Sequence, residues 1–482
     1  MKRYFQLLLT FTLISKNLSS QSNSTNTCNC SDNLKILINK TEENYAGYPS
    51  KAKNKNSIGY KKNIQHLVTK AVKVTNPKLC FYILKEYVRF FEDKHFTLSY
   101  QNENDYDYEI INITENDYKK NTVNKKLHQI EGIWINADST IKLAIMKTSD
   151  NIFKAVVVKS NHPKIPIGLV YMKLVQTPKG FIAKEYNSFL TTDVPAKQKR
   201  NLLQIWNFAL FGKIYPSQIS NDEIEELKTW RANNNGLNFK LLSSKTAYLK
   251  IPTFKNNEEQ IQQLVLKNDS IIRNSENLII DITGNGGGST GWVSILPYII
   301  TNPIVQFDSY IRVTPENTKY KLKDLEPFVL HPIPNEYKKY FPKDVLNAYK
   351  KAYQELPVTS QEFYPIPGVT FPLDSITKKP SKVALLVDDL CGSSSEYFFF
   401  ISKQSKKTKT YGINTIGMMD YEGMSNITPL PYPNYYLTIP IVKSSWTNKN
   451  PIDKTGFKPD ILLNKIDQVK WVEWLQNHLE KN

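Results

Sequence analysis

Two apolar segments that each end in small residues carry the residue types best suited to chemistry. Residues 278–288 read LIIDITGNGGG, and residues 383–396 read VALLVDDLCGSSSE. Each is a β-prone run that stops at glycine or serine, which is typical of a buried parallel strand that leads into a loop and a helix. Because parallel strands place such loops at one edge of a sheet, we expect the two segments to converge there.

A serine at the start of a helix, next to a glycine loop, suits nucleophilic attack on a carbonyl. The serine hydroxyl of Ser393 can be exposed after a small residue, and backbone N–H groups of a glycine loop can approach the oxygen that becomes negative. Taken singly, a glycine cluster is usually a turn, and S-S-S-E is usually a helix cap closed by Glu396. The ordered pair of segments favours a serine hydrolase.

The same segments resemble the tail-specific, or C-terminal-processing, serine protease family. Its domain has a strand ending near D-x-R-x-N-G-G-G and a later strand leading to S-A-S-E, and here residues 281–288 read DITGNGGG and residues 393–396 read SSSE. TGFKPDIL at 455–462 is similar to the closing G-x-x-P-D-I of the family. The resemblance covers about 238–466 and implies an α/β catalytic domain of ClpP/crotonase-like ββα units with Ser393 as nucleophile. The expected oxyanion hole is the N–H of Ser394 with one N–H from Gly287 or Gly288.

The lysine that serves as the base in one branch of this family is absent from the chain. In the branch that uses a Ser-Lys dyad, a lysine stands in a T-x-G-K context, but residues 415–420 read TIGMMD, with Met418 at the lysine position. A thioether cannot take the proton of a serine hydroxyl. The chain therefore either is an inactive relative or takes its base from elsewhere.

FFEDKHFT at 90–97 is similar to the motif that supplies an upstream histidine base in the tricorn-like branch. By this resemblance His95 is the base, and the ordinary pKa of histidine suits the task near neutral pH. The alternative is a surface or packing histidine. The acidic partner in that branch stands three residues before the glycine of the closing motif, where this chain has Asp453; Asp93 is a weaker substitute, and Lys94 replaces the hydroxyl neighbour of the histidine. Either carboxylate is alternatively a solvated loop residue.

The sequence thus predicts an exported serine-type peptidase that acts on protein or peptide substrates through Ser393, His95 and Asp453, without a cofactor. No metal-ligand spacing, phosphate loop or dinucleotide fingerprint is present. The alternative is a catalytically inactive relative that binds peptides or a small apolar ligand. Met418 favours the alternative, and the joint presence of His95 and Ser393 favours the enzyme.

Residues 1–20 have the pattern of a signal peptide: Lys2 and Arg3, an apolar stretch at 4–14, and the small residues Ser19 and Ser20. We expect cleavage after Ser20 and a periplasmic or extracellular location. No later stretch is apolar for long enough to predict a spanning helix.

Export permits disulfides, and the chain has four cysteines. Cys28 and Cys30 lie too close in sequence to bridge each other, so one of them is expected to pair with Cys80, and we favour Cys30. Cys391 follows an apolar strand and is expected to be a buried small residue rather than a second nucleophile.

The net charge is +18, from 63 Lys and Arg against 45 Asp and Glu. The positive residues are almost all lysines spread along the chain, whereas nucleic-acid recognition favours arginine and lysine clustered on one element. We therefore expect no nucleic-acid partner and interpret the charge as a solvated surface; an acidic substrate or envelope surface is the functional alternative.

Periodicity divides the remaining chain into three parts. Residues 31–110 have apolar residues at helical spacing and carry His95 at their end, and residues 120–215 alternate as short antiparallel strands of a small barrel or sandwich. Residues 238–482 form the expected catalytic domain, with an insertion at 302–382 that is either a lid over the site or a surface excursion. The small β domain binds substrate or is only a spacer. The sequence does not indicate the oligomeric state.

Overall fold

The structure is a computed structural model that describes residues 28–54, 56–100, 109–184, 193–231, 235–335, 338, 341–372, 376–424 and 427–481. The signal peptide expected at 1–20 lies outside the described residues. None of the helices in the described ranges has the length and apolar character that crossing a membrane requires.

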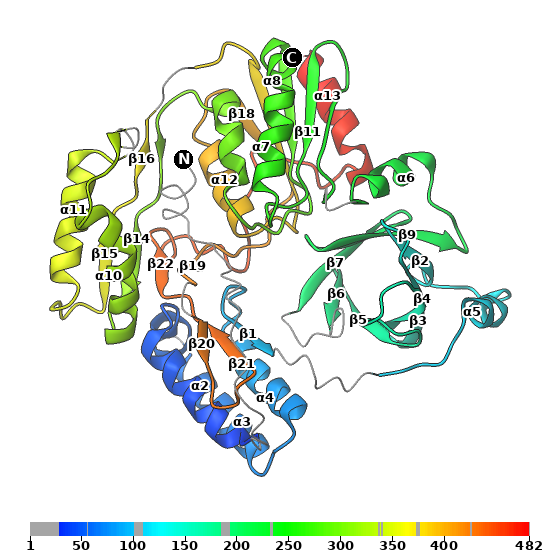
Figure 1. Cartoon of the computed structure of the whole chain (residues 1–482), viewed down its shortest axis with the longest axis horizontal. Helices are drawn as coiled ribbons and strands as arrows, with labels where there is room; N and C mark the ends of the chain where they lie inside the picture. Colours follow the sequence, from blue (N-terminus) through cyan, green and yellow to red (C-terminus); the bar gives the residue numbers. More distant parts are fainter. Residues whose placement is uncertain are drawn as a thin grey trace.

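A six-stranded sheet contains the apolar runs of the segments 278–288 and 383–396 (Figure 1). In spatial order its strands are β10 (Asn238–Leu241), β11 (Thr246–Lys250), β12 (Asn277–Asp281), β17 (Lys382–Val387), β18 (Thr408–Gly412) and β23 (Ile461–Leu462). β10 pairs antiparallel with β11, and the other pairs are parallel. β12 and β17 are direct neighbours, so the glycine loop and the serine loop leave the same edge of the sheet.

Helices cover both faces of this sheet, which explains why its central strands are continuous apolar runs. On one face, Leu278 and Ile280 of β12 share a core with α7 (Glu258–Lys267) and α12 (Ser394–Ser402). On the other face, Ile279 packs in a core with α13 (Trp471–Lys481). The remaining helices beside this sheet are α8 (Asp269–Asn274), α9 (Leu296–Ile299) and the 3-10 turn η4 (Gly291–Ile295).

The antiparallel segment closes into an eight-stranded barrel. Its strands are β2 (Gly132–Asn136), β3 (Ile141–Ser149), β4 (Ile152–Ser160), β5 (Val170–Thr177), β6 (Gly180–Lys184), β7 (Val194–Lys199), β8 (Leu202–Ile205) and β9 (Ala209–Tyr215). Alternate residues point inward and form a separate apolar core around Trp134 and Phe153. The sequence left a barrel or a sandwich open, and the structure has a barrel. Helices α5 (Glu115–Thr122) and α6 (Asn221–Lys228) flank it.

The N-terminal helices share their core with segments from the far end of the chain. These helices are α2 (Cys30–Asn44), α3 (Ser57–Ala71) and α4 (Pro77–Arg89), and the strand β1 (Thr97–Tyr100) follows. β1 pairs antiparallel with β21 (Tyr435–Thr438), which pairs with β20 (Ile427–Pro429). This pairing brings the loop before β1 to the C-terminal part of the sheet domain.

The insertion at 302–382 also packs against this shared core. It contributes two helices, α10 (Pro315–Val329) and α11 (Lys343–Glu355). Its strands β14 (Ser309–Arg312) and β15 (Phe363–Ile366) form a second sheet with β19 (Tyr421–Glu422) and β22 (Val442–Ser444). Two further strands, β13 (Ile304–Val305) and β16 (Thr370–Phe371), pair with each other. Phe328 and Tyr349 of its two helices belong to the same apolar cluster as Phe81 of α4. The insertion is thus a structural support of the N-terminal helices.

A disulfide joins Cys30, the first residue of α2, to Cys80 in α4. This is the pairing that the sequence favoured. Cys28 and Cys391 are buried free thiols, and burial raises the pKa of both.

We expect non-reducing peptide mapping of the oxidised protein to find Cys80 linked to Cys30. Because a cross-link restricts the unfolded chain, Cys30→Ala with Cys80→Ala should lower the free energy of unfolding by about 2–5 kcal/mol in urea titrations. Cys391, which forms no disulfide in the described structure, serves as the unmodified thiol in the same digest. A Cys28–Cys80 link would contradict the pairing.

Candidate active site

The structure brings Ser393 and His95 into hydrogen-bonding contact although 298 positions separate them in the sequence. The distance from His95 Nε2 to Ser393 Oγ is 3.1 Å. Ser393 stands between β17 and α12, whereas His95 lies in the loop between α4 and β1. Both side chains are buried, with 6% and 4% exposed. A serine and a histidine in this geometry can act as a nucleophile and its base.

Ser393 adopts a backbone conformation that few side-chain-bearing residues adopt, with φ 53° and ψ −120°. Such a residue costs of order 1–3 kcal/mol and persists only where its surroundings hold it. A sharp turn between a strand and a helix presents the serine oxygen at the edge of the sheet. Glu396 holds this turn from within α12, because its carboxylate accepts the N–H of Ser393 at 3.2 Å.

A backbone carbonyl orients the imidazole of His95. Its Nδ1 lies 2.8 Å from the carbonyl oxygen of Tyr421. Because a carbonyl can only accept, the Tyr421 contact favours the tautomer with the proton on Nδ1, in which Nε2 accepts the Ser393 hydroxyl. A backbone contact to Met418 also acts on the ring.

Asp93 supports His95 through the main chain rather than through the ring. Its carboxylate accepts the N–H of His95 at 2.9 Å and the hydroxyl of Tyr45 at 2.7 Å. Complete burial lowers the pKa of His95, and the nearby Asp93 charge and the Tyr421 carbonyl act in the opposite direction. The net result is an imidazole that is neutral at neutral pH and ready to accept a proton.

Asp453 lies beside the site, but its carboxylate does not bond to His95. One oxygen binds Lys51 Nζ at 2.5 Å, and the other has no partner among the described residues. Burial and the neighbouring Asp93 raise the pKa of Asp453 to about 8, while Lys51 opposes the rise. The expected contact of Asp453 to the imidazole is therefore not formed, because the Tyr421 carbonyl occupies that side of the ring.

Lys94, which replaces the hydroxyl neighbour found in the tricorn-like branch, bridges two carbonyls. Its Nζ donates to the oxygens of Gly417 and Asp453, both at 2.9 Å. Burial lowers the pKa of Lys94, and the surrounding carboxylates oppose this. The lysine thereby ties the His95 loop to the loop that follows β18.

Of the predicted oxyanion donors, Ser394 fits the role better than Gly287. Ser394 is the first residue of α12, so its N–H has no acceptor within the helix. The N–H of Gly287 is already donated to Asn285 at 2.9 Å. Gly287 has φ 93°, and a Cβ there would lie 2.8 Å from Ser394 N and 2.9 Å from Ser393 Cβ. A side chain at 287 would therefore cover the space in front of the nucleophile.

Glu396 also positions the loop that contains Met418. Its carboxylate accepts the N–H of Gly417 and of Met418, both at 2.8 Å, and the hydroxyl of Thr415 at 2.5 Å. Complete burial raises the pKa of Glu396 to about 7, although these donors favour its ionised form. The buried Met418 side chain contributes packing, since its sulfur lies next to Gly392.

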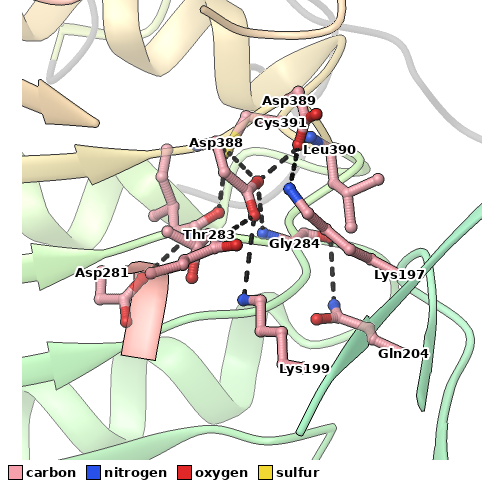
Figure 2. Close-up of polar contacts among 12 residues, drawn as sticks. Lys197, Lys199, Gln204, Asp281, Thr283, Gly284, Asp388, Asp389, Leu390 and Cys391 are labelled. Carbon is pink, nitrogen blue, oxygen red and sulfur yellow. Dashed lines mark hydrogen bonds and ion pairs between the residues drawn. The ribbon is translucent and has the colours of Figure 1, made fainter. Parts of the chain in front are cut away.

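The glycine loop and the serine loop are held together by Asp388, which the sequence reasoning did not single out (Figure 2). One oxygen of this fully buried carboxylate accepts the N–H of Gly284 at 2.8 Å and of Leu390 at 3.1 Å. The other oxygen accepts the side chain of Gln468 at 2.9 Å. Because Asp388 bonds to both loops, it sets their separation.

The barrel reaches this edge of the sheet with lysines and polar side chains. Lys199 of β7 lies 4.0 Å from Asp388, and Lys197 binds Asp389 at 2.6 Å (Figure 2). Burial raises the pKa of Asp388, but Lys199 and Lys197 outweigh burial and hold it below its ordinary value. Gln204 of β8 donates to the carbonyl of Gly284 at 3.4 Å. The barrel is therefore part of the frame of the site.

Three contributors escaped the sequence reasoning for a common reason. The Tyr421 carbonyl is a backbone group with no signature in side-chain type. Asp388 stands inside the quoted VALLVDDL segment and Lys51 in a helical region, but neither residue type nor spacing ties them to Ser393.

Within the described ranges, no group of three or more His, Cys, Asp or Glu could hold a metal ion.

Comparison with known proteins matches part of this chain to one family model. Residues 245–463 match the model of peptidase family S41. The structure of mature CPAF aligns with 93% of this chain and 96% of its own at 14% identity and a TM-score of 0.51. Mature CPAF complexed with lactacystin aligns with 93% of this chain and 98% of its own at 15% identity and a TM-score of 0.52. At such identities the likeness concerns the fold alone. No curated protein sequence matches the chain.

We expect the rate at which a fluorophosphonate labels Ser393 to rise with pH as His95 loses its proton. Because burial lowers the pKa of His95, the midpoint should lie below the ordinary histidine value of about 6.5. Labelling followed by gel fluorescence between about pH 4 and 8 measures it. His95→Gln should label slowly at every pH, and a midpoint above the ordinary value would contradict the proposed environment.

We expect Glu396→Gln to loosen the turn at Ser393. An amide cannot accept on both of its polar atoms, so at least one buried N–H loses its acceptor, at a cost of about 1–3 kcal/mol in the free energy of unfolding. The free energy of unfolding from urea titration and the rate of fluorophosphonate labelling should both fall. Glu259→Gln, at an exposed first-turn position of α7, is the matched control. Unchanged stability and labelling in Glu396→Gln would show that Glu396 does not hold the turn at Ser393.

Proposed function

The chain belongs to peptidase family S41 through its residues 245–463, and we propose that it is an exported serine peptidase that uses Ser393 and His95 to hydrolyse peptide bonds in protein or peptide substrates. The observation that carries the proposal is the 3.1 Å contact between His95 Nε2 and Ser393 Oγ. In this proposal the sheet domain is a ClpP/crotonase-like arrangement that supplies the nucleophile, and the N-terminal helices supply the base.

The proposed reaction begins when Ser393 Oγ attacks the carbonyl carbon of a peptide bond. The hydroxyl proton passes to His95 Nε2, and the carbonyl oxygen becomes an oxyanion that accepts the N–H of Ser394 and of Gly288. A donor of this kind contributes roughly 3–4 kcal/mol to the stabilisation of the transition state. His95 then gives the proton to the leaving amine, and water releases the acyl group by the reverse sequence of proton transfers.

The charged imidazole formed during the reaction needs support that its carbonyl partner supplies only in part. In our proposal the Tyr421 carbonyl holds the ring, and the carboxylate of Asp93, two residues away, supplies negative charge without contacting the ring. Asp453 acts more remotely, since Lys51 occupies its carboxylate and Lys94 its carbonyl. In this proposal the Tyr421 carbonyl, with the carboxylate of Asp93 nearby, takes the place of the acidic residue that orients the histidine in a triad.

Export to the periplasm or the cell exterior is proposed from the N-terminal sequence. The basic and apolar residues at 2–14 have the pattern of a signal peptide, and the Cys30–Cys80 disulfide suits an oxidising compartment.

An inactive relative that binds peptides is the second candidate, and Met418 is the observation that favours it. In the structure, however, Met418 gives its N–H to Glu396 and its side chain packs at Gly392. Because His95 already contacts the nucleophile, the loss of a lysine at 418 does not remove the base from the site.

Peptidase assays of three alanine variants test the proposal. Ser393→Ala and His95→Ala should each lower kcat by several orders of magnitude, since only the oxyanion donors and substrate binding remain. Ser395→Ala is the matched control, because Ser395 Oγ is buried and has no partner among the described residues. Its activity should stay close to that of the native protein, as measured by hydrolysis of an unstructured protein such as casein.

Met418→Lys separates the two candidate functions in the same assay. If His95 is the base, a lysine at 418 adds nothing and disturbs packing at Gly392, so the activity should not increase. A silent native protein that becomes active in Met418→Lys, or full activity in His95→Ala, would identify a degenerate Ser-Lys peptidase instead.

A further inference from the structure

A cavity of about 700 Å³ lies between the barrel and the loops that carry the proposed catalytic residues. Its walls come from α4 and β1, from β5 to β7 of the barrel, and from the loops after β17 and β18. The volume falls in the range of sites that bind ligands, about 300–1,000 Å³. It is too large to be an ordinary packing defect in a protein interior.

On the barrel side, the cavity is bounded by an apolar patch on the outer surface of the barrel. Phe181 and Ala183 of β6 point into the barrel core, so Ile182 between them points outward. Ile182 pairs with Pro195 on β7, and both residues line the cavity. This apolar pair therefore faces the cavity and not the barrel's own core.

The opposite wall has apolar residues next to the proposed catalytic dyad, together with the charged Asp93, Lys94 and Asp453. Phe96, Leu98 and Leu390 line it, and all three are buried. Phe96 follows His95 directly, and Leu390 stands three residues before Ser393. Trp206 of the barrel closes one end, where its indole donates to the carbonyl of Leu390 at 2.8 Å.

Ion pairs at two sides hold the walls apart and keep the cavity from collapsing. On one side, Lys85 and Arg89 of α4 bind Asp193 next to β7, at 3.0 and 2.7 Å. On the other side, Lys197 of β7 binds Asp389 at 2.6 Å. These contacts fix the barrel at its rim, while the apolar surfaces between the two sides do not meet. Polar contacts at the edge of an unfilled apolar space are the arrangement of a ligand pocket.

An edge strand runs along the same cavity. β1 pairs with β21 and occupies the end of its three-stranded sheet in the described structure, and its residues Thr97 and Leu98 line the cavity. An edge strand offers backbone groups to an extended peptide, and a neighbouring pocket then selects among its side chains. A hydrocarbon ligand would make no use of such backbone groups.

We propose that this cavity is a subsite that takes one large apolar side chain, such as Leu or Phe, of an extended peptide substrate lying along β1. The barrel thus serves as a specificity element of the peptidase, with Ile182 as a specificity-determining residue. This inference rests on the proposed function for its substrate class.

The test fills the cavity from the barrel side, away from Ser393 and His95. Ile182→Trp is compared with Ile152→Trp, the same change at an exposed position of β4 outside the cavity. Both variants and the native protein are given fluorogenic peptides in which each position in turn is Leu, Phe or Ala. The native protein should prefer Leu or Phe over Ala at one position by about tenfold or more in kcat/KM. Ile182→Trp should abolish that preference through KM, and Ile152→Trp should keep it.

Two further measurements separate failure of this inference from failure of the proposed function. Fluorophosphonate labelling of Ser393 in Ile182→Trp should match the native rate, which shows that the proposed dyad is intact. Ser393→Ala protein, with and without Ile182→Trp, is titrated with the preferred peptide and its Ala counterpart by calorimetry, so that binding is read without catalysis. If the native protein cleaves none of the peptides, every member of the series is titrated.

The inference is overturned if cleavage and binding show the same apolar preference in Ile182→Trp as in the native protein, or if no position shows a preference. A peptide-binding preference that Ile182→Trp removes, in a protein that neither labels nor cleaves, would support the subsite and refute the peptidase. Should Ile182→Trp lose the circular dichroism spectrum of the native protein, Thr177→Trp fills the cavity from the end of β5 and replaces it.

Discussion

The contact between His95 and Ser393 is the interaction on which the proposed chemistry depends, and the chain needs both of its ends to make it. Ser393 belongs to the sheet domain, whereas His95 enters from the N-terminal helices. The pairing of β1 with β21 and the apolar core shared by α4 and the insertion bring the two parts together. Burial of this core stabilises the fold and, at the same time, brings His95 next to Ser393.

The strained turn at Ser393 imposes a second requirement, because an unfavourable backbone conformation must be held from outside. Glu396 meets it by accepting the N–H of Ser393 and two N–H groups of the loop at 417–418. One buried carboxylate thus connects the nucleophile to the loop after β18. Asp388 has the same function between the serine loop and the glycine loop. In both cases a buried acidic side chain accepts backbone N–H groups from two separate segments.

The barrel is joined to the sheet domain by ion pairs and by hydrogen bonds from Gln204 and Trp206. Its lysines bind acidic groups at the edge of the sheet, and Asp193 binds the basic residues of α4. Ion pairs at the rims of the barrel and the facing elements leave a cavity between them, next to the loop of His95. The excess of lysine, which the sequence analysis assigned to a solvated surface, includes at Lys197 and Lys199 residues that dock one domain on another.

The sequence by itself indicated the central strands, the helix at 394–402 and the antiparallel segment; it favoured the Cys30–Cys80 pairing over Cys28–Cys80, and its family resemblance pointed to the two residues of the proposed dyad. Each of these depends on local periodicity, on a short motif or on few alternatives. Tertiary structure decided that a carbonyl of Tyr421, rather than Asp453, orients His95, and that Asp388 joins the two loops. A backbone acceptor is present at every residue, so no residue type marks the one that folding places beside an imidazole. The barrel and the insertion acquired their roles in the same way, because a docking contact depends on which surfaces meet in space.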